Sequence, residues 1–326
     1  MMTRRDLCAG ALAAAGASSL LRGAQKLREQ RYLHYDVFTD RPLTGNQLAV
    51  FSGPIDLTTD DMARITREMN FSECTFIFPA EQPDTDVRLR IFSPEGELPF
   101  AGHPVIGSTY ALAHAGLVKA SQGRVILGLG IGPTKVDLEW KGTQLAFAWM
   151  TQQPPKYGPT LDARDRMASV LGIDQAAIHE GVPIQEISCG LAFLFVPLTS
   201  RAAVDRCALD ARASEAMLKD AGLAPRGTFV FSVEPGDDHA TVYSRMLGAA
   251  REDPATGSAS GPLGCYLIRY RLVPPGQAGN MVSRQGVKMG RPSRVHIRIA
   301  GTPDEITDVK VGGSSVLVGD GRITRI

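Results

Sequence analysis

The chain has 326 residues, which is long enough to bury one large core or two moderate ones, with two domains as the better expectation. Its 35 Lys and Arg residues balance 34 Asp and Glu residues, so the net charge does not indicate a nucleic-acid partner. Hydrophobic residues make up 44% and aromatic residues 6% of the chain, which fits a globular protein and argues against a disordered one.

The first thirty residues differ in composition from the rest. Arg4 and Arg5 precede CAGALAAAGASSLL, an uncharged run rich in small residues. This pattern is typical of a twin-arginine export signal, and Ala15 and Ala17 form a small-x-small cleavage pattern. We therefore expect residues 1–30 to be a signal peptide and the mature protein to be exported or periplasmic, without a membrane span. The alternative is a frayed amphipathic helix at the start of a cytoplasmic protein.

The cysteines indicate neither a metal site nor a disulfide framework. Cys8 lies in the expected signal, and the other four are Cys74, Cys189, Cys207 and Cys265. None belongs to a CxxC pair, and no group of cysteines and histidines has zinc-ligand spacing. Because a core of this size does not need disulfides, we expect buried free thiols.

Helices and strands alternate through the first half. The sequence predicts, in chain order, a hairpin of strands over 32–40 and 48–53, a helix over 58–69, strands over 75–80 and 87–93, and a helix over 104–117. The first helix has Thr59 or Asp60 as its predicted N-cap. The N-terminus of the second lies at Gly102 and His103, and it closes at Gly116.

The second half repeats this order, with a strand over 190–198, a helix over 211–221, strands over 228–233 and 240–247, and a helix over 258–268. Four residues recur at a constant offset of 155 positions: Arg90, Glu97, Pro99 and Gly102 return as Arg245, Glu252, Pro254 and Gly257. This indicates an internal duplication. It predicts two similar halves related by a pseudo-two-fold axis, with equivalent loops meeting in the middle.

A glycine-rich segment, LGLGIG over 127–132, could be mistaken for a dinucleotide-binding loop. It lacks the GxGxxG spacing and leads into the strand-like TKVDLEW rather than into a helix. The sequence therefore predicts a hairpin here, and it contains neither a Rossmann fingerprint nor a P-loop.

Each repeat ends in a strand, a tight loop with proline and glycine, and the start of a helix. The loops are ELPFAGHPVIG, which places His103 at one helix start, and EDPATGSASG, which places Asp253, Thr256 and Ser258 at the other. Backbone N–H groups at a helix start are unpaired and attract anions. Two such helix starts aimed at one cleft would suit a substrate that bears a carboxylate.

Three segments carry a specific resemblance. NFSECTFIF, PFAGHPVIGSTYALA and EDPATGSASGPLGCYL resemble the signature segments of the PhzF-like (phenazine biosynthesis) family, and DVFTDRPLTGNQLAVF and QGVKMGRPSRV are similar to it too. The resemblance implies an α+β protein with the diaminopimelate epimerase fold, in which two pseudo-symmetric lobes each wrap a curved sheet around a central helix. The expected lobes are 31–148, completed by the C-terminal strand, and 149–326, with the active site between them.

The resemblance also implies the chemistry. It predicts a cofactor-independent isomerase, like trans-2,3-dihydro-3-hydroxyanthranilate isomerase, that moves a proton on a small carboxylate-bearing substrate and forms a homodimer. The implied catalytic residues are Glu73 as acid/base, His103 and Asp253, and the implied substrate-binding residues are Asn46, Gly102, Gly257 and Ser258. A glutamate desolvated between closing lobes has a raised pKa, so it can take and return a proton near neutral pH.

Other readings of the same residues remain open. Epimerases of this fold carry a cysteine before the glycine at each helix start, whereas Ala101 and Thr256 occupy those places here, which disfavours a two-thiol racemase. A serine hydrolase using Ser258 is a second possibility, although GSASG lacks the central serine of a GxSxG elbow. A non-catalytic small-molecule-binding protein is a third. Glu73 could also be an exposed strand-edge carboxylate, His103 a helix cap and Asp253 a turn residue.

Overall fold

The computed structural model describes residues 28–53 and 56–325, so the expected export signal lies almost wholly outside the described residues. Its last three residues, from Arg28, already belong to the first strand. In the described part of the chain, no helix is long and apolar enough to cross a membrane.

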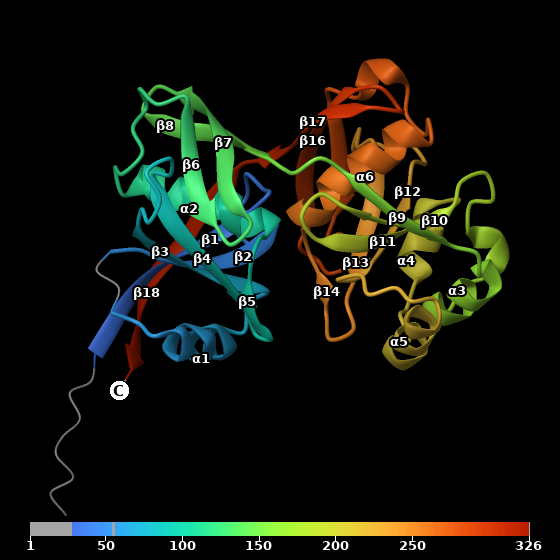
Figure 1. The fold of residues 1–326 in the computed structure, drawn as a ribbon, viewed down its shortest axis with the longest axis horizontal. Helices are drawn as coiled ribbons and strands as arrows, with labels where there is room; N and C mark the ends of the chain where they lie inside the picture. The colour runs from blue at the N-terminus through green and yellow to red at the C-terminus, as the bar shows by residue number, and fades with distance from the viewer. Residues whose placement is uncertain (1–27, 54–55, 326) are drawn as a thin grey trace, which may run out of the picture.

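The described residues form a mixed 18-stranded sheet with few helices. The first group of strands lies around α2 (Gly102–His114), with α1 (Thr59–Met69) on its outside (Figure 1). It comprises β1 (Arg28–Val37), β2 (Asn46–Phe51), β3 (Glu73–Pro79), β4 (Val87–Ser93), β5 (Gly96–Leu98), β6 (Arg124–Leu129), β7 (Gly132–Lys141), β8 (Gln144–Thr151) and the C-terminal β18 (Ser315–Arg325), which pairs with β1.

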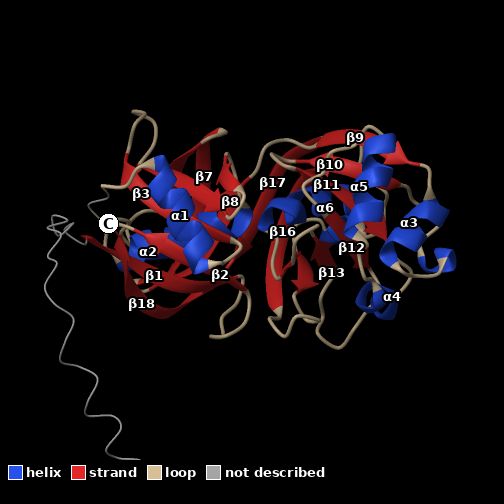
Figure 2. Cartoon of the chain, turned by 90° about the horizontal axis from the view of Figure 1, so that it is seen from below, coloured by secondary structure: helices blue, strands red, loops and turns tan. Residues whose placement is uncertain are grey.

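The second group lies around α6 (Gly257–Arg269). Its strands are β9 (Lys156–Leu161), β10 (Ile184–Ser188), β11 (Ala192–Pro197), β12 (Thr228–Ser232), β13 (Val242–Leu247), β14 (Glu252–Asp253), β15 (Met281–Gln285), β16 (Ser293–Gly301) and β17 (Ile306–Gly313). Its other helices are α3 (Arg164–Leu171), η1 (Gln175–Ala177), α4 (Arg201–Arg206), α5 (Ala211–Asp220) and η2 (Pro275–Gln277). Figure 2 shows α3 and α5 at the end of the molecule away from α1.

The strand pairings of the first group recur in the second. β2 and β3 are parallel, β3 and β4 antiparallel, and β4 and β6 parallel across α2. β11 and β12, β12 and β13, and β13 and β15 repeat these relations across α6. The duplicated arginines and glutamates make the same two-bond contact: Arg90 to Glu97 at 2.8 and 2.6 Å, and Arg245 to Glu252 at 2.9 and 2.7 Å.

The two central helices are composed mainly of apolar and small residues and are enclosed by the strands on all sides. In α2 every residue from Gly102 to Leu112 is buried, and in α6 every residue from Gly257 to Ile268. The outer helix α1 is amphipathic and buries only Met62, Ile65 and Thr66.

Several predicted boundaries need correction. The N-cap of α1 is Thr58, whose side chain accepts from the Asp61 backbone while the Asp61 carboxylate accepts from the Thr58 backbone, so the prediction of Thr59 or Asp60 was wrong. Helix α2 ends at His114 rather than at residue 117, because Gly116 takes a left-handed conformation. The glycine-rich hairpin is confirmed, with Leu129 opposite Gly132 in β6 and β7.

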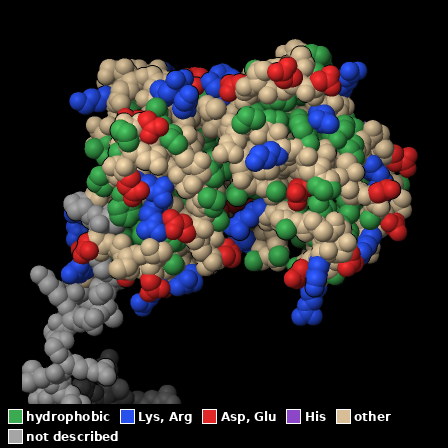
Figure 3. Space-filling model, in the orientation of Figure 1, with side chains coloured by type: hydrophobic (Ala, Val, Ile, Leu, Met, Phe, Trp, Pro, Cys, Tyr) green, Lys and Arg blue, Asp and Glu red, His purple; other side chains and the backbone are tan. Residues whose placement is uncertain are grey.

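The four cysteines beyond the signal segment are all buried and free, as predicted. On the face shown in Figure 3, acidic and basic side chains are interspersed, in keeping with the net charge of +1.

Candidate active site

A cavity of about 270 Å³ lies between the two strand groups. Six of the seven residues expected at the site line it: Glu73, Gly102, His103, Asp253, Gly257 and Ser258. The seventh, Asn46, does not line the cavity. It lies behind the lining and hydrogen-bonds to Asp253 and His103. The structure thus brings all seven predicted residues together.

The starts of α2 and α6 meet at this cavity, and their glycines make the contact possible. A Cβ on Gly102 would lie 2.4 Å from the Ser258 backbone nitrogen and 2.5 Å from Cα of Gly257. A Cβ on Gly257 would lie 2.7 Å from the Phe38 ring. Only residues without a side chain let the two helix starts approach this closely.

Neither helix start is capped by a side chain. The N-caps Ala101 and Thr256 make no capping hydrogen bond, and the Thr256 hydroxyl donates instead to Asp253 Oδ2 at 2.6 Å. Backbone N–H groups of both helices therefore remain available at the cavity, where the helix dipoles favour an anion.

Glu73 and His103 form a close pair in this cavity. Glu73 begins β3, and its Oε2 lies 3.4 Å from Nε2 of His103, with 17% and 3% of the two side chains exposed. Burial, and next the charge of Asp253, raise the pKa of Glu73 to about 8. Burial lowers the pKa of His103 to about 3, although a hydrogen bond to the Gln47 backbone opposes this.

The two pKa shifts determine the protonation states of Glu73 and His103. At neutral pH they favour a protonated carboxyl beside a neutral imidazole, so the contact is not an ion pair in spite of its distance. Within the described residues, Nε2 of His103 has no hydrogen-bond partner of normal geometry. A buried polar atom of this kind, next to a carboxyl and a cavity, is free to interact with a bound molecule.

Asp253 is fixed by a network that spans both strand groups. Its carboxylate accepts hydrogen bonds from Asn46 at 2.8 Å, Ser72 at 3.0 Å and Thr256 at 2.6 Å, and its backbone carbonyl accepts from Gln285 at 2.8 Å. Burial raises the pKa of Asp253, while these side-chain donors lower it. Asp253 is thus a fully hydrogen-bonded anchor of the cavity wall rather than a free carboxylate.

Sequence reasoning missed four residues of the site. Ser72 and Gln285 lie inside the recognised segments NFSECTFIF and QGVKMGRPSRV, so their positions could have been flagged. Arg226 and Arg251 belong to no motif, yet both line the cavity and their charges lower the pKa of Glu73. Arg251 also donates to the backbone and side-chain oxygens of Asn70 at 3.3 and 3.1 Å, which links the two strand groups at the cavity mouth.

Leu98, Leu191, Phe193 and Met246 form an apolar part of the wall, and Ser93 and Glu95 add further polar groups. In residues 28–53 and 56–325, no group of three or more His, Cys, Asp or Glu side chains could hold a metal ion. The cavity therefore combines an apolar part of its wall, two helix starts and a titratable pair.

Solved structures of PhzF-type proteins and of an epimerase share the fold of this chain. A PhzF-family phenazine biosynthesis protein of Bacillus anthracis matches with a TM-score of 0.81 at 23% identity, over 91% of this chain and 99% of that one. A hydroxyproline epimerase of Agrobacterium vitis matches with a TM-score of 0.60 at 15% identity, over 91% and 93% of the two chains. These likenesses define the fold.

Sequence comparison narrows the assignment. The profile of the family described as phenazine biosynthesis-like protein matches residues 35–321. The trans-2,3-dihydro-3-hydroxyanthranilate isomerase of Pseudomonas aeruginosa is 35% identical over 292 residues, which are 90% of this chain and 98% of that enzyme. The chain therefore belongs to the phenazine biosynthesis-like (PhzF) family, and it is an isomerase.

Proposed function

We propose that this isomerase moves a proton on a small carboxylate-bearing substrate, with Glu73 as the group that takes and returns the proton. The observation that carries the proposal is the pair at the cavity: a carboxyl whose pKa is raised to about 8, 3.4 Å from a buried imidazole nitrogen without a hydrogen-bond partner. A group whose pKa lies near the working pH accepts and releases a proton at little cost in either direction.

The protonation states give Glu73 and His103 different roles. The ionised fraction of Glu73 is large enough near pH 8 to abstract a carbon-bound proton, and the protonated form can then return it to another carbon. His103 has a pKa of about 3, so it is a poor acid or base at neutral pH, and its neutral Nε2 instead orients Glu73 or a substrate group. Asp253 and Asn46 hold the opposite wall in place through their mutual hydrogen bond.

The substrate class follows from the lining. The unpaired N–H groups at Gly102 and Gly257 would bind a carboxylate, and the apolar part of the wall would hold a small carbon skeleton. A cavity of about 270 Å³ suits a single-ring acid or a short acyclic acid. We propose an amino or hydroxy acid similar to trans-2,3-dihydro-3-hydroxyanthranilate, the substrate that the relative's name states.

The proposal also covers the division of the chain into lobes, its oligomeric state and its export. We propose that residues 31–148 and 149–326 are two pseudo-symmetric α+β lobes that close on the substrate. The repeated strand pairings and the pairing of β18 with β1 support this division. We also propose a homodimer, to be tested by light scattering, and export of the mature protein through the twin-arginine segment.

The contacts favour proton transfer over the hydrolase alternative. In the hydrolase alternative, an imidazole nitrogen of His103 would be the base for Ser258. In the structure Nε2 of His103 faces Glu73 and Nδ1 lies 3.1 Å from the Asn46 amide nitrogen. Labelling of Ser258 by a fluorophosphonate would contradict this reasoning.

A ligand screen followed by hydrogen exchange tests the proposed function. Cyclic and acyclic amino and hydroxy acids are first screened by thermal shift on the full chain, and each ligand is then incubated with enzyme in deuterated water. We expect at least one ligand to gain carbon-bound deuterium, which mass spectrometry measures. Tight binding without any exchange would mean a binding protein and would overturn the proposal.

A further inference from the structure

A second cavity, of about 430 Å³, lies apart from the candidate active site. It shares no lining residue with the first cavity. Residues of the loop after β1 and side chains of β15 and β16 line it. Its lining consists of Phe38, Thr39, Asp40, Arg41, Thr44, Asp238, Arg284, Pro292, Arg294, His296 and Ser314.

Two arginines lie side by side on neighbouring strands of the cavity lining. Arg284 of β15 and Arg294 of β16 are directly opposed partners in the antiparallel pair. Both are only partly exposed, with 25% of the Arg284 side chain accessible. Like charges directly opposite each other destabilise a sheet unless an anion lies between them.

The nearest carboxylate is already engaged by a third arginine. Asp238 accepts two hydrogen bonds from Arg201, at 3.0 and 2.9 Å, and this pairing lowers the pKa of Asp238 and keeps it ionised. Arg201 also donates to the Glu234 backbone carbonyl at 2.9 Å. The charges of Asp238 and Arg201 therefore largely cancel.

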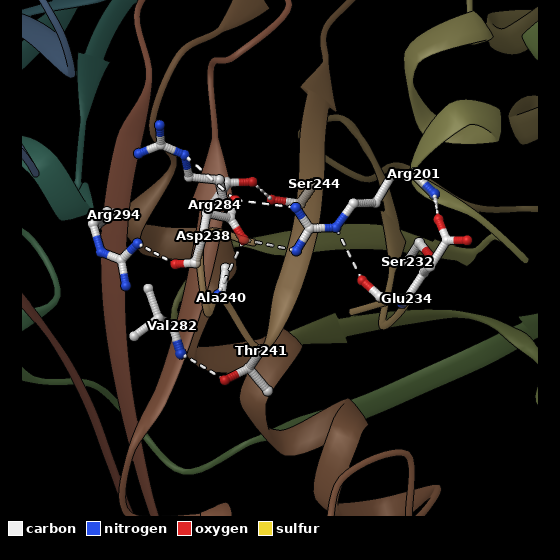
Figure 4. Close-up of polar contacts among 10 residues, drawn as sticks. All are labelled: Arg201, Ser232, Glu234, Asp238, Ala240, Thr241, Ser244, Val282, Arg284 and Arg294. Atoms are coloured by element: carbon white, nitrogen blue, oxygen red, sulfur yellow. Dashed lines mark hydrogen bonds and ion pairs between the residues drawn. The ribbon is translucent and has the colours of Figure 1, made fainter. Parts of the chain in front are cut away.

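Arg284 and Arg294 retain unused donors. Nε of Arg284 lies 3.8 Å from Asp238, and Figure 4 shows the two Nη nitrogens of Arg284 turned away from Asp238. The guanidinium of Arg294 donates to the Asp238 backbone carbonyl, at 3.0 Å, through Nη1. Among the described residues, no carboxylate lies within ion-pair distance of Arg294. Guanidinium groups in a cavity with free N–H donors match the geometry of a phosphate or carboxylate.

The other lining residues supply further donors. Ser314 contributes a hydroxyl group, and Arg41 adds a third positive charge. The hydroxyls of Thr39 and Thr44 also line the cavity, but both donate to the Arg41 backbone carbonyl. Burial, together with the charges of Arg294 and Arg298, lowers the pKa of His296, so its neutral imidazole can donate one N–H. Asp40 is the one lining carboxylate besides Asp238, and it is exposed.

We propose that this cavity is a binding site for a phosphate group, held between Arg284 and Arg294 and completed by the Ser314 hydroxyl. Free phosphate and the phosphate of a small organic molecule share this chemistry. The cavity is larger than a phosphate ion requires, which leaves room for an attached organic group.

Calorimetric titration of the full chain tests the site. Sodium phosphate, adenosine monophosphate and sodium chloride are titrated at equal ionic strength. We expect both phosphate compounds to bind and chloride not to bind, and tighter binding of the nucleotide would show that the organic part is held as well. Arg284→Gln and Arg294→Gln should each weaken phosphate binding by about tenfold or more, because each removes charge-assisted hydrogen bonds.

Arg322→Gln provides the matched control. Arg322 is an exposed arginine on β18, paired with Glu29 at 2.9 Å, so its removal changes the net charge equally but leaves the cavity intact. Phosphate binding should be unchanged in this variant. Equal weakening in all three variants, the same heat with chloride, or no phosphate binding at millimolar concentration would each overturn the proposal. If one of the two cavity variants fails to fold, phosphate binding by the other variant tests the proposal.

Discussion

Replacing Gly102 by alanine places a methyl group where the two helix starts touch. The added Cβ would lie 2.4 Å from the Ser258 backbone nitrogen and 2.5 Å from Cα of Gly257, and backbone atoms cannot rotate out of its way. Because carbon contacts are favourable only near about 3.5 Å, the starts of α2 and α6 must separate by about 1 Å. Overpacking of this kind costs about 1–3 kcal/mol of unfolding free energy.

The same separation should disturb the site. A displacement of about 1 Å costs on the order of 10²-fold in rate, and the stability loss should lower Tm by roughly 2–5 °C. Scanning calorimetry and the rate of deuterium exchange into the screened ligand measure the two effects. Gly123→Ala is the control, since a Cβ there meets nothing within 4 Å. A Gly102→Ala protein that matches this control in Tm and rate would refute the packing of the two helix starts.

Three further outcomes are expected. The pKa of Glu73 rises from 4.5 to about 8 on folding, so the folded protein keeps a proton that the unfolded chain releases. Because the lowered pKa of His103 has the opposite effect only below its ordinary value of 6.5, the free energy of unfolding should fall as pH rises from 6.5 to about 8. Urea titrations measure this fall, and Glu73→Gln should reduce it. Arg245→Ala should cost about 3–5 kcal/mol in chemical denaturation because its ion pair is buried, and Arg90→Ala, in the more exposed copy of the same pair, about 0–1 kcal/mol. Replacing Arg4 and Arg5 by lysine should retain the protein in the cytoplasm, which cell fractionation measures. A wild-type protein that is itself cytoplasmic and keeps its first residue would contradict the export signal.

Local patterns in the sequence predicted the helices and strands that have a clear hydrophobic periodicity or clear turn residues at their ends. The strand over 87–93 coincides with β4, and the helix over 211–221 differs from α5 by one residue. The sequence also located the two helix starts at glycines. The structure explains these glycines, because the backbones approach each other too closely for any other residue. The N-cap of α1 was misplaced because several adjacent residues can cap a helix, and only the reciprocal bonds with Asp61 select Thr58.

The parts that the sequence could not predict depend on contacts between distant segments. Arg226 and Arg251 reach the cavity from loops without a motif, so only the folded chain shows their charge beside Glu73. Arg284 and Arg294 look like unrelated surface residues in the sequence. Alternation along a strand tells which face a residue takes but not which residue of the next strand lies opposite, and their opposition follows only from the register of β15 and β16.

The proton-carrying role of Glu73 is tested most directly by measuring turnover and ligand affinity of Glu73→Gln beside the wild type. The substitution keeps the shape of the side chain and removes the proton acceptor, so the rate should fall by about 10²–10⁴. Affinity should stay within about tenfold, because the helix starts that bind the carboxylate are untouched. Glu68→Gln, at an exposed carboxylate of α1 that does not line the cavity, is the control and should keep its rate. A Glu73→Gln protein with near-normal turnover would contradict the assignment of Glu73 as the proton carrier.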